Sequence, residues 1–334
     1  MVVERGVRDN RRHAERGAAL LLAMIIVVLV AAVTAGMVWQ QSRAVQIEAA
    51  ERARAQSAWI LSGALDWARL ILREDLRDNQ RSQSPHDGLD EPWATPLAEA
   101  RLSTFLAADK NNNSDAGVEA FLSGAIADAQ ARFNLRGLID DGGKPVQVQV
   151  AALARLCALA GLPMDTAARI GEGLVSAWSL TGLDGEGRPL DRDAQPLRPA
   201  RFADLSWLGL DADALSALQP WVDLLPTRTP VNLNTAPREV MVAAIDGIDV
   251  GSAERLVQAR QREPFSKLDD VKALLGPNIE LDPNRVSVLS NYFVVSGRLR
   301  LDERVLEEQS LLVRRDSRVD VLRRERRSFT AVIP

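Results

Sequence analysis

Four carboxylates gather in one loop that is rich in glycine and proline, within the run L-D-G-E-G-R-P-L-D-R-D. They are Asp184, Glu186, Asp191 and Asp193. Carboxylate oxygens are the ligands that Ca²⁺ prefers in proteins. The loop is therefore a candidate calcium site, and an acidic loop without a metal is the alternative.

A second polar turn, A-D-K-N-N-N-S-D-A at residues 108–116, imitates the start of an EF-hand loop. An EF-hand needs glycine at its sixth position and a bidentate glutamate at its twelfth. Ser114 and Ala120 stand at those positions. The sequence therefore favours a solvated turn here.

The chain offers little else for catalysis or metal binding. Cys157 is the single cysteine, so an intrachain disulfide and a thiolate cluster are both excluded. The two histidines, His13 and His86, are too few for a histidine-rich metal site. The sequence has neither a phosphate-binding loop nor a nucleophile elbow, and its formal net charge of −4 argues against a general nucleic-acid binder. We expect a protein that is not an enzyme.

The run V-N-L-N-T-A-P at residues 231–237 resembles the start of a helix-hairpin-helix unit. Thr235 is expected to cap the first helix, with Pro237 in its opening turn. Gly247 should end that helix, and Ser252 should open the next.

Helix-hairpin-helix units that bind DNA use a glycine-rich hairpin, whose amides approach a phosphate at a helix N-terminus. Here the hairpin is G-I-D-V-G at residues 247–251. Asp249 stands where a second glycine is needed, and its carboxylate repels phosphate. The sequence favours a structural use of this unit, and a membrane-anchored DNA-binding protein is the alternative function.

These motifs follow a long apolar segment. Residues Ala18 to Ser42 contain no charge and are long enough to cross a bilayer as a helix. A basic leader ends at Arg16-Gly17, and its excess of arginine places it on the cytoplasmic side. We therefore expect a single-pass anchor with the rest of the chain across the membrane.

The apolar helix is expected to continue well beyond the membrane. Residues 43–77 contain no proline and are rich in good helix formers. One helix from Leu20 to Leu76 would be about 85 Å long. Two helices with a hinge at Gly63 are the alternative. Residues 78–96 read as a loop.

Strand patterns lie on both sides of a helical block. Residues 118–135 suggest two short strands joined at Ser123-Gly124, and residues 145–289 read as helices broken by glycine and proline. Residues 291–327 contain three candidate strands, with a tight turn at Asp316-Ser317. The expected class is α+β: a long N-terminal spine helix packed on an antiparallel sheet, with a large all-α domain inserted between its strands.

Several separated motifs resemble those of the minor pseudopilin K family of type II secretion systems. The leader resembles a type III signal, with Leu22 where most pilins carry glutamate at the fifth mature position. The runs L-D-E-P-W-A at 89–94, D-A-Q-A-R-F-N-L at 128–135 and N-L-N-T-A-P at 232–237 resemble family motifs. The positions that carry this resemblance are Leu22, Asp90, Glu91, Trp93, Arg132, Phe133, Asn134, Asn232, Asn234, Thr235 and Pro237.

The resemblance implies a domain order and a processing step. Prepilin peptidase would cut between Gly17 and Ala18, followed by methylation of the new N-terminus. The segments would be the leader 1–17, the transmembrane and spine helix 18–77, a first pilin-like part 78–144, an inserted helical domain 145–289 and C-terminal strands 290–334, with the helix-hairpin-helix-like half at 231–289.

The resemblance also implies a function. The protein would be a minor pseudopilin in the bacterial inner membrane, with its C-terminal domain in the periplasm and minor pseudopilins I and J as partners. It would sit at the tip of the pseudopilus, help to start its assembly and take part in exporting folded proteins. Relatives often carry an acidic D-W-x-D-x-D string linked to calcium, of which Trp178 remains here without its flanking acids. No cofactor other than calcium, and no nucleic acid, is expected.

Overall fold

The structure, a computed structural model, describes residues 4–102, 120–178, 197–301 and 304–330, with side chains from Leu20 onward. The candidate calcium loop at residues 184–193 and the polar turn at residues 108–116 lie outside the described residues. The chain divides into two compact units, residues 1–60 and residues 61–334.

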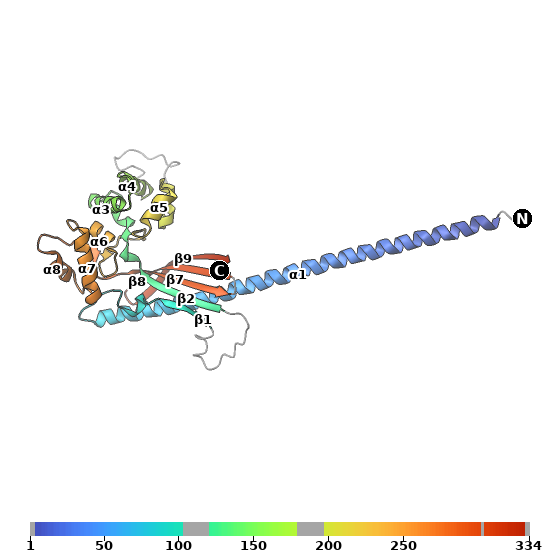
Figure 1. Ribbon diagram of the computed structural model, residues 1–334, viewed down its shortest axis with the longest axis horizontal. Coiled ribbons are helices and arrows are strands. Elements are labelled where there is room, and N and C mark those ends of the chain that lie inside the picture. The colour runs from blue at the N-terminus through green and yellow to red at the C-terminus, as the bar shows by residue number, and fades with distance from the viewer. Residues whose placement is uncertain (1–3, 103–119, 179–196, 302–303, 331–334) are drawn as a thin grey trace, which may run out of the picture. The chain divides into compact units, whose positions relative to one another are not determined.

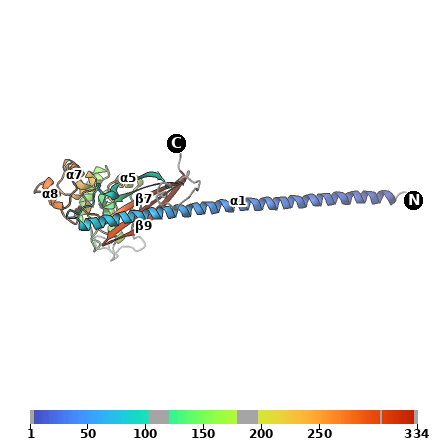
Figure 2. The ribbon, with the colours of Figure 1, turned by 90° about the horizontal axis from the view of Figure 1, so that it is seen from below.

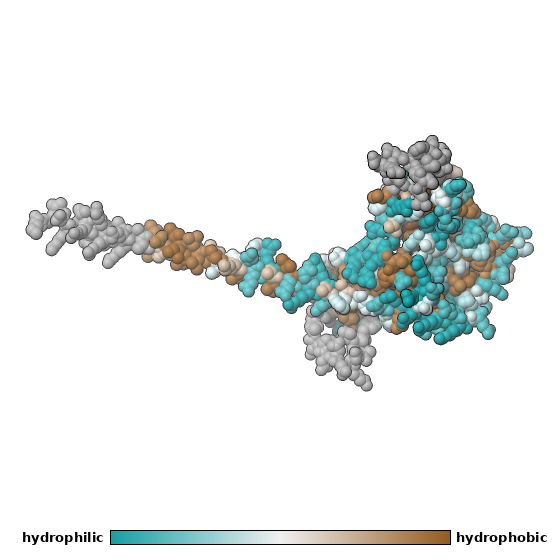
Figure 3. Space-filling view, turned by 180° about the vertical axis from the view of Figure 1, so that it is seen from behind, coloured by the Kyte–Doolittle hydropathy of each residue, from teal (hydrophilic) through white to brown (hydrophobic). Residues whose placement is uncertain are grey.

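The first unit is formed by the long helix α1, which spans Glu4–Arg81 and continues into the second unit. Its apolar window has a mean hydropathy of 2.8, and α1 is the one helix among the described residues that is long and apolar enough to cross a membrane. The apolar side chains of this segment appear as the brown band of the helix in Figure 3. Helix α1 continues through Gly63, so the alternative of two helices with a hinge there is wrong. The helix ends five residues later than expected, at Arg81 instead of Leu76.

The second unit contains an antiparallel sheet of five strands in the order β1-β2-β7-β8-β9 (Figure 1). Its strands are β1 (Leu97–Arg101), β2 (Ala120–Asp128), β7 (Tyr292–Leu301), β8 (Arg304–Arg315) and β9 (Arg318–Thr330). Strands β8 and β9 are joined by the tight turn predicted at Asp316-Ser317, where Asp316 has a φ of 52°. The three C-terminal strands are therefore confirmed.

The part of α1 that belongs to the second unit packs on one face of this sheet (Figures 1 and 2). Leu65, Ala68 and Leu72 form an apolar stripe at helical spacing. This stripe contacts Phe293 on β7 and Leu312 on β8. Burial of these side chains supplies the hydrophobic attachment of helix to sheet.

A helical domain lies between β2 and β7 in sequence, although these two strands are neighbours in the sheet. It has its own apolar core. Its α-helices are α3 (Gln147–Leu159), α4 (Thr166–Trp178), α5 (Ala212–Leu218), α6 (Arg238–Ala244), α7 (Val250–Arg262) and α8 (Leu268–Leu275). The expected α+β class, with a helical domain inserted between the strands of the sheet, is confirmed.

Two parallel pairs of two-residue strands connect distant segments of the helical domain. Strand β3 (Phe133–Asn134) pairs with β4 (Val222–Asp223), and β5 (Val231–Asn232) pairs with β6 (Val286–Ser287). Parallel pairing is possible here because each pair joins segments far apart in the chain.

The expectation of two strands joined at Ser123-Gly124 is wrong. Both residues lie inside the single strand β2, whose register with β7 is unbroken from Ala120 to Asp128. Gly124 is needed for close strand contact, because a Cβ there would lie 2.9 Å from the Ser296 carbonyl oxygen. The edge strand β1, which pairs with β2, was missed because its sequence, L-A-E-A-R, carries little strand signal.

Candidate functional site

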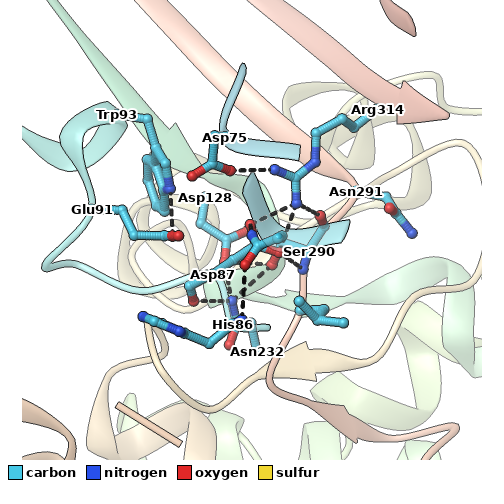
Figure 4. Close-up of polar contacts among 12 residues, drawn as sticks. Asp75, His86, Asp87, Glu91, Trp93, Asp128, Asn232, Ser290, Asn291 and Arg314 are labelled. Atoms are coloured by element: carbon cyan, nitrogen blue, oxygen red, sulfur yellow. Dashed lines mark hydrogen bonds and ion pairs between the residues drawn. The ribbon is translucent and has the colours of Figure 1, made fainter. Parts of the chain in front are cut away.

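A buried polar cluster joins the sheet, the loop after α1 and the inserted domain (Figure 4). We call it the junction and define it as Asp87, Asp128, Asn232, Ser290 and Arg314. Asp128 ends β2, Asn232 ends β5 and Arg314 lies near the end of β8. Asp87 and Ser290 lie in loops next to these strand ends, so each element contributes one side chain to the junction.

Arg314 is the cation at the centre of the junction. Its Nη2 donates to both oxygens of Asp87, at 2.6 and 2.7 Å, and to the Ser290 carbonyl at 2.7 Å. Its Nη1 donates to Asp75 Oδ2 of α1 at 2.5 Å. The guanidinium also stands 4.8 Å from the ring centroid of Phe293. A buried charge is tolerated only when it is paired and hydrogen-bonded, and Arg314 meets both conditions.

Asp128 collects hydrogen bonds from the inserted domain. Its Oδ2 accepts from Ser290 Oγ at 2.6 Å, from Thr235 Oγ1 at 2.6 Å and from Asn232 Nδ2 at 2.9 Å. Burial raises the pKa of Asp128 to about 6, while the hydrogen bonds from Ser290 and Thr235 work in the opposite direction. The strand end and the insert are thus connected through one carboxylate.

Asn232 and Asn234 hold the N-L-N-T-A-P segment in place. The Asn232 amide also donates to the Asp87 carbonyl at 2.9 Å, and its Oδ1 accepts from the Asn234 backbone N–H. The Asn234 side chain pairs with the backbone N–H and carbonyl of Phe265, at 2.9 Å each. The side chains of these two asparagines provide the hydrogen bonds that regular secondary structure would otherwise give to this irregular backbone.

Glu91 and Trp93 lie beside the junction. Trp93 Nε1 and the Gly88 backbone N–H each donate to Glu91 Oε2 at 2.8 Å. The Trp93 ring packs edge-on against Phe293, with centroids 5.2 Å apart. The L-D-E-P-W-A segment therefore anchors its loop by a buried aromatic ring and one carboxylate.

Three carboxylates meet at this point, on Asp75, Asp87 and Glu91, with oxygens that lie within 4.8 Å of one another. Burial, together with the neighbouring Glu91, raises the pKa of Asp75 to about 8. Such a group has the residue types of a metal site. Arg314 already contacts Asp75 and Asp87, however, so a guanidinium supplies the positive charge here.

The D-A-Q-A-R-F-N-L segment binds the neighbouring strand and loop. Arg132 pairs with Asp223 at 2.6 Å, and Phe133 is buried in the core of the insert. Asn134 donates to the Thr227 carbonyl at 2.7 Å and accepts from the Leu225 backbone N–H at 3.1 Å. This segment connects the end of β2 to the inserted domain.

The helix caps of the helix-hairpin-helix-like unit differ from expectation. Thr235 does not cap α6, because its hydroxyl donates to Asp128, and Pro237 stands at the N-cap. Helix α6 ends at Ala244, before Gly247, which has a φ of 84°. Helix α7 begins at Val250 and not at Ser252.

Asp249 is the N-cap of α7, and its Oδ1 accepts from the Ser252 backbone N–H at 2.7 Å. That amide is the type of donor that a phosphate would use at a helix N-terminus. Since the carboxylate of Asp249 already occupies this position, the hairpin is capped by its own side chain.

The remaining predicted positions are separate from the junction. Leu22 lies in the apolar part of α1, and Pro237 precedes α6. Asp90 lies on a half-exposed turn, with its Oδ2 3.3 Å from His86 Nε2. Burial opposes the charged ring, yet hydrogen bonds to the Ser84 carbonyl and to Asp90 raise the pKa of His86.

Sequence reasoning missed Asp87, Ser290 and Arg314 as members of the junction. Asp87 stands two residues before the L-D-E-P-W-A run, and Arg314 looks like an ordinary strand residue in L-L-V-R-R. Asp87 is hydrogen-bonded to Ser290 and to Arg314, which lie 203 and 227 residues away in the sequence. The one signal in the sequence for a buried polar site was Arg314 itself, a charged residue at the end of an apolar strand pattern.

Comparison with known proteins identifies the family. A relative from Pseudomonas aeruginosa, type II secretion system protein K, is 30% identical over 331 residues, which cover 94% of this chain and 93% of the relative. The chain belongs to the protein K family of type II secretion systems. A second protein K, from Pectobacterium carotovorum subsp. carotovorum, is 25% identical and covers 97% of this chain and 100% of the relative. The family description "Type II secretion system (T2SS), protein K" matches residues 231–295, which contain both asparagines of the N-L-N-T-A-P segment.

A solved structure shares the fold. In the crystal structure of the GspK-GspI-GspJ complex from enterotoxigenic Escherichia coli, the matching chain is 23% identical. The match covers 83% of this chain and 98% of that chain, with a TM-score of 0.60. Protein K is a pseudopilin, a structural component of the secretion system and not an enzyme.

Proposed function

We propose that this protein is the minor pseudopilin at the tip of a periplasmic pseudopilus, where it helps to start assembly and to export folded proteins across the outer membrane. The observation that carries the proposal is the combination of an apolar α1 without a carboxylate at Leu22 and an inserted helical domain.

The missing carboxylate supports the distal position. In other subunits a glutamate at this position would pair with the N-terminal amine of the subunit already above. An unpaired carboxylate in the hydrocarbon region is unfavourable by a few kcal/mol, so a subunit with no neighbour above is better served by Leu22. The bulk of the insert would also hinder a further subunit.

The proposal includes processing and topology. Residues 1–17 form a cytoplasmic leader that prepilin peptidase removes between Gly17 and Ala18, and the mature helix anchors the protein in the inner membrane. The second unit, residues 61–334, stands in the periplasm with minor pseudopilins I and J as its partners. Mass spectrometry of the mature protein should show an N-terminus at Ala18, and a start after Gly36 would contradict this processing.

Co-purification tests the partnership. The detergent-solubilised full chain, co-expressed with minor pseudopilins I and J of the same secretion system, should elute with both as one complex. A Leu22→Glu variant should not improve secretion, because no amine stands above it. Failure to form the complex, or a gain in secretion from Leu22→Glu, would contradict the tip position.

A further inference from the structure

A pocket of about 230 Å³ lies between the turn at residues 88–90 and the end of α7. Its lining comes from three segments: the turn at residues 88–90, the N-L-N-T-A-P segment and the end of α7. The lining residues are Gly88, Leu89, Asp90, Asn234, Arg260, Gln261 and Pro264.

Arg260 is the cation of this pocket. Its Nη1 donates to the Leu233 and Ala236 carbonyls, at 2.7 Å each, which fixes the guanidinium against the N-L-N-T-A-P segment. No carboxylate lies within ion-pair distance of Arg260 in the part of the chain that the structure describes. Burial lowers the pKa of Arg260 to about 10, and the group still carries its charge at neutral pH.

The unused edge of the guanidinium has a defined shape. With Nη1 committed to two carbonyls, Nε and Nη2 have no acceptor among the described residues. Unlike Nε of Arg314, which is sealed from solvent without a partner, neither nitrogen is buried. Nε and Nη2 present two parallel N–H groups, the geometry that matches both oxygens of a carboxylate.

The other lining groups decide between ligand classes. Leu89 is 61% exposed on one rim, and Pro264 adds apolar surface on the α7 side. Asp90 also lines the pocket, but its Oδ2 faces His86 and its Oδ1 lies over Gly88. A pocket with one fixed guanidinium, an apolar rim and one carboxylate suits an acidic side chain with an apolar neighbour better than a phosphate-rich polyanion.

We infer that this pocket binds an acidic side chain from an extended segment of a partner protein, with Arg260 as the bidentate donor and Leu89 and Pro264 as contacts for the residue beside the acid. Because Arg260 is held in place before the ligand arrives, little side-chain entropy is lost on binding. The inference does not depend on the tip position and concerns a surface outside the junction.

Binding of a blocked peptide tests this inference. The probe is acetyl-leucyl-aspartyl-leucine amide, titrated into the detergent-solubilised full chain and followed by saturation-transfer NMR, with its asparagine twin for comparison. The aspartyl peptide should bind about tenfold more tightly than the twin, as expected for one charge-assisted bidentate contact. Equal binding of the two peptides, or binding of neither, would overturn the inference.

Variants locate the effect. Arg260→Gln should remove the preference for the aspartyl peptide, whereas Arg262→Gln, at an exposed position two residues further along α7, should preserve it. Asp90→Asn should strengthen binding by removing the opposing charge. Because Arg260→Gln also loses the two hydrogen bonds to backbone carbonyls, Gln261→Glu provides a second test. It adds a negative charge to the pocket lining and should weaken binding of the aspartyl peptide without changing those hydrogen bonds.

Two results would reassign the pocket. If inorganic phosphate displaced the peptide at equal concentration, the pocket would be a general anion site and the inference would fail. Retention of a DNA oligonucleotide that is lost in Arg260→Gln would likewise replace the acidic peptide with a phosphodiester backbone.

Discussion

The junction and the hairpin at residues 247–251 lie in or beside the same inserted domain, and both contain an aspartate next to a helix or strand end. In the junction, Asp87 and Asp128 are buried, and each collects several hydrogen bonds from distant segments. In the hairpin, Asp249 is exposed and bonds to Ser252, three residues away. Aspartate thus joins distant elements where it is buried and caps a local helix where it is exposed.

This difference predicts unequal energetic consequences. Removing one partner from a buried ionic cluster leaves another charge without compensation, whereas removing an exposed cap lets water replace it. The expected effects below run from the centre of the junction to the hairpin, and all are measured on the detergent-solubilised full chain.

Arg314→Met should be the most destabilising change. It leaves the Asp87 carboxylate buried without its cation, which should lower the free energy of unfolding by about 3–5 kcal/mol. Urea unfolding followed by tryptophan fluorescence measures this loss. Arg262→Met, at an exposed position, is the matched control and should change stability little. Equal stability of the two variants would mean that the junction does not hold the fold together.

Asn232→Ala should have the next largest effect. The substitution removes donors to Asp128 and to the Asp87 carbonyl and the acceptor of the Asn234 N–H, all of them buried. Unsatisfied buried groups of this kind should lower the free energy of unfolding by about 2–3 kcal/mol. Asn284→Ala, which changes an exposed asparagine in a local turn, is the control by residue type. A similar loss in both variants would mean that the buried hydrogen bonds of Asn232 contribute no more to stability than those of an exposed turn.

The junction should also make stability depend on pH. A carboxyl group with a raised folded-state pKa stabilises the fold fully below its ordinary pKa, and this contribution is lost as the pH rises through the folded value. The folded values of about 6 for Asp128 and about 8 for Asp75 both lie above the ordinary value of 3.8. The free energy of unfolding should therefore fall by about 1 kcal/mol or more between about pH 5 and about pH 8.

Asp75→Asn isolates the upper part of this dependence. The variant should lose most of the slope near the folded pKa of Asp75 and keep the slope near that of Asp128. Urea unfolding at a series of pH values gives both slopes. A wild-type stability that stays level or rises through this range would show that these carboxyls are not protonated in the folded protein.

Asp249→Gly should be the mildest change, with a smaller loss of stability than Asn232→Ala in the same unfolding experiment. Only one exposed hydrogen bond is removed, and water can replace it.

The wild-type protein should not retard DNA in a gel-shift assay at physiological salt, because the Asp249 carboxylate already accepts from the backbone N–H that a phosphate would use. Retardation by the wild-type protein would contradict the structural role of the hairpin.

The parts of the fold that were predicted correctly have signals in the local sequence. The apolar segment before Arg43 and the strand patterns on either side of the Asp316-Ser317 turn depend on composition and periodicity along a short stretch of chain. The errors arose where local signals compete. Ser123-Gly124 resembles a turn but lies inside β2, because β7 offers it a partner strand. Thr235 resembles a helix cap but donates to Asp128.

The sequence by itself determined the long apolar helix, the α+β class and the segments that carry the family motifs, because each depends on residues that are close together in the chain. Only the tertiary structure decided that these motifs meet. Asp128 and Asn232 are separated by 104 residues and Asp87 and Arg314 by 227, yet both pairs are hydrogen-bonded. Contacts of this kind form because sheet pairing and helix packing bring strand ends together, and buried polar groups at those ends must then satisfy one another.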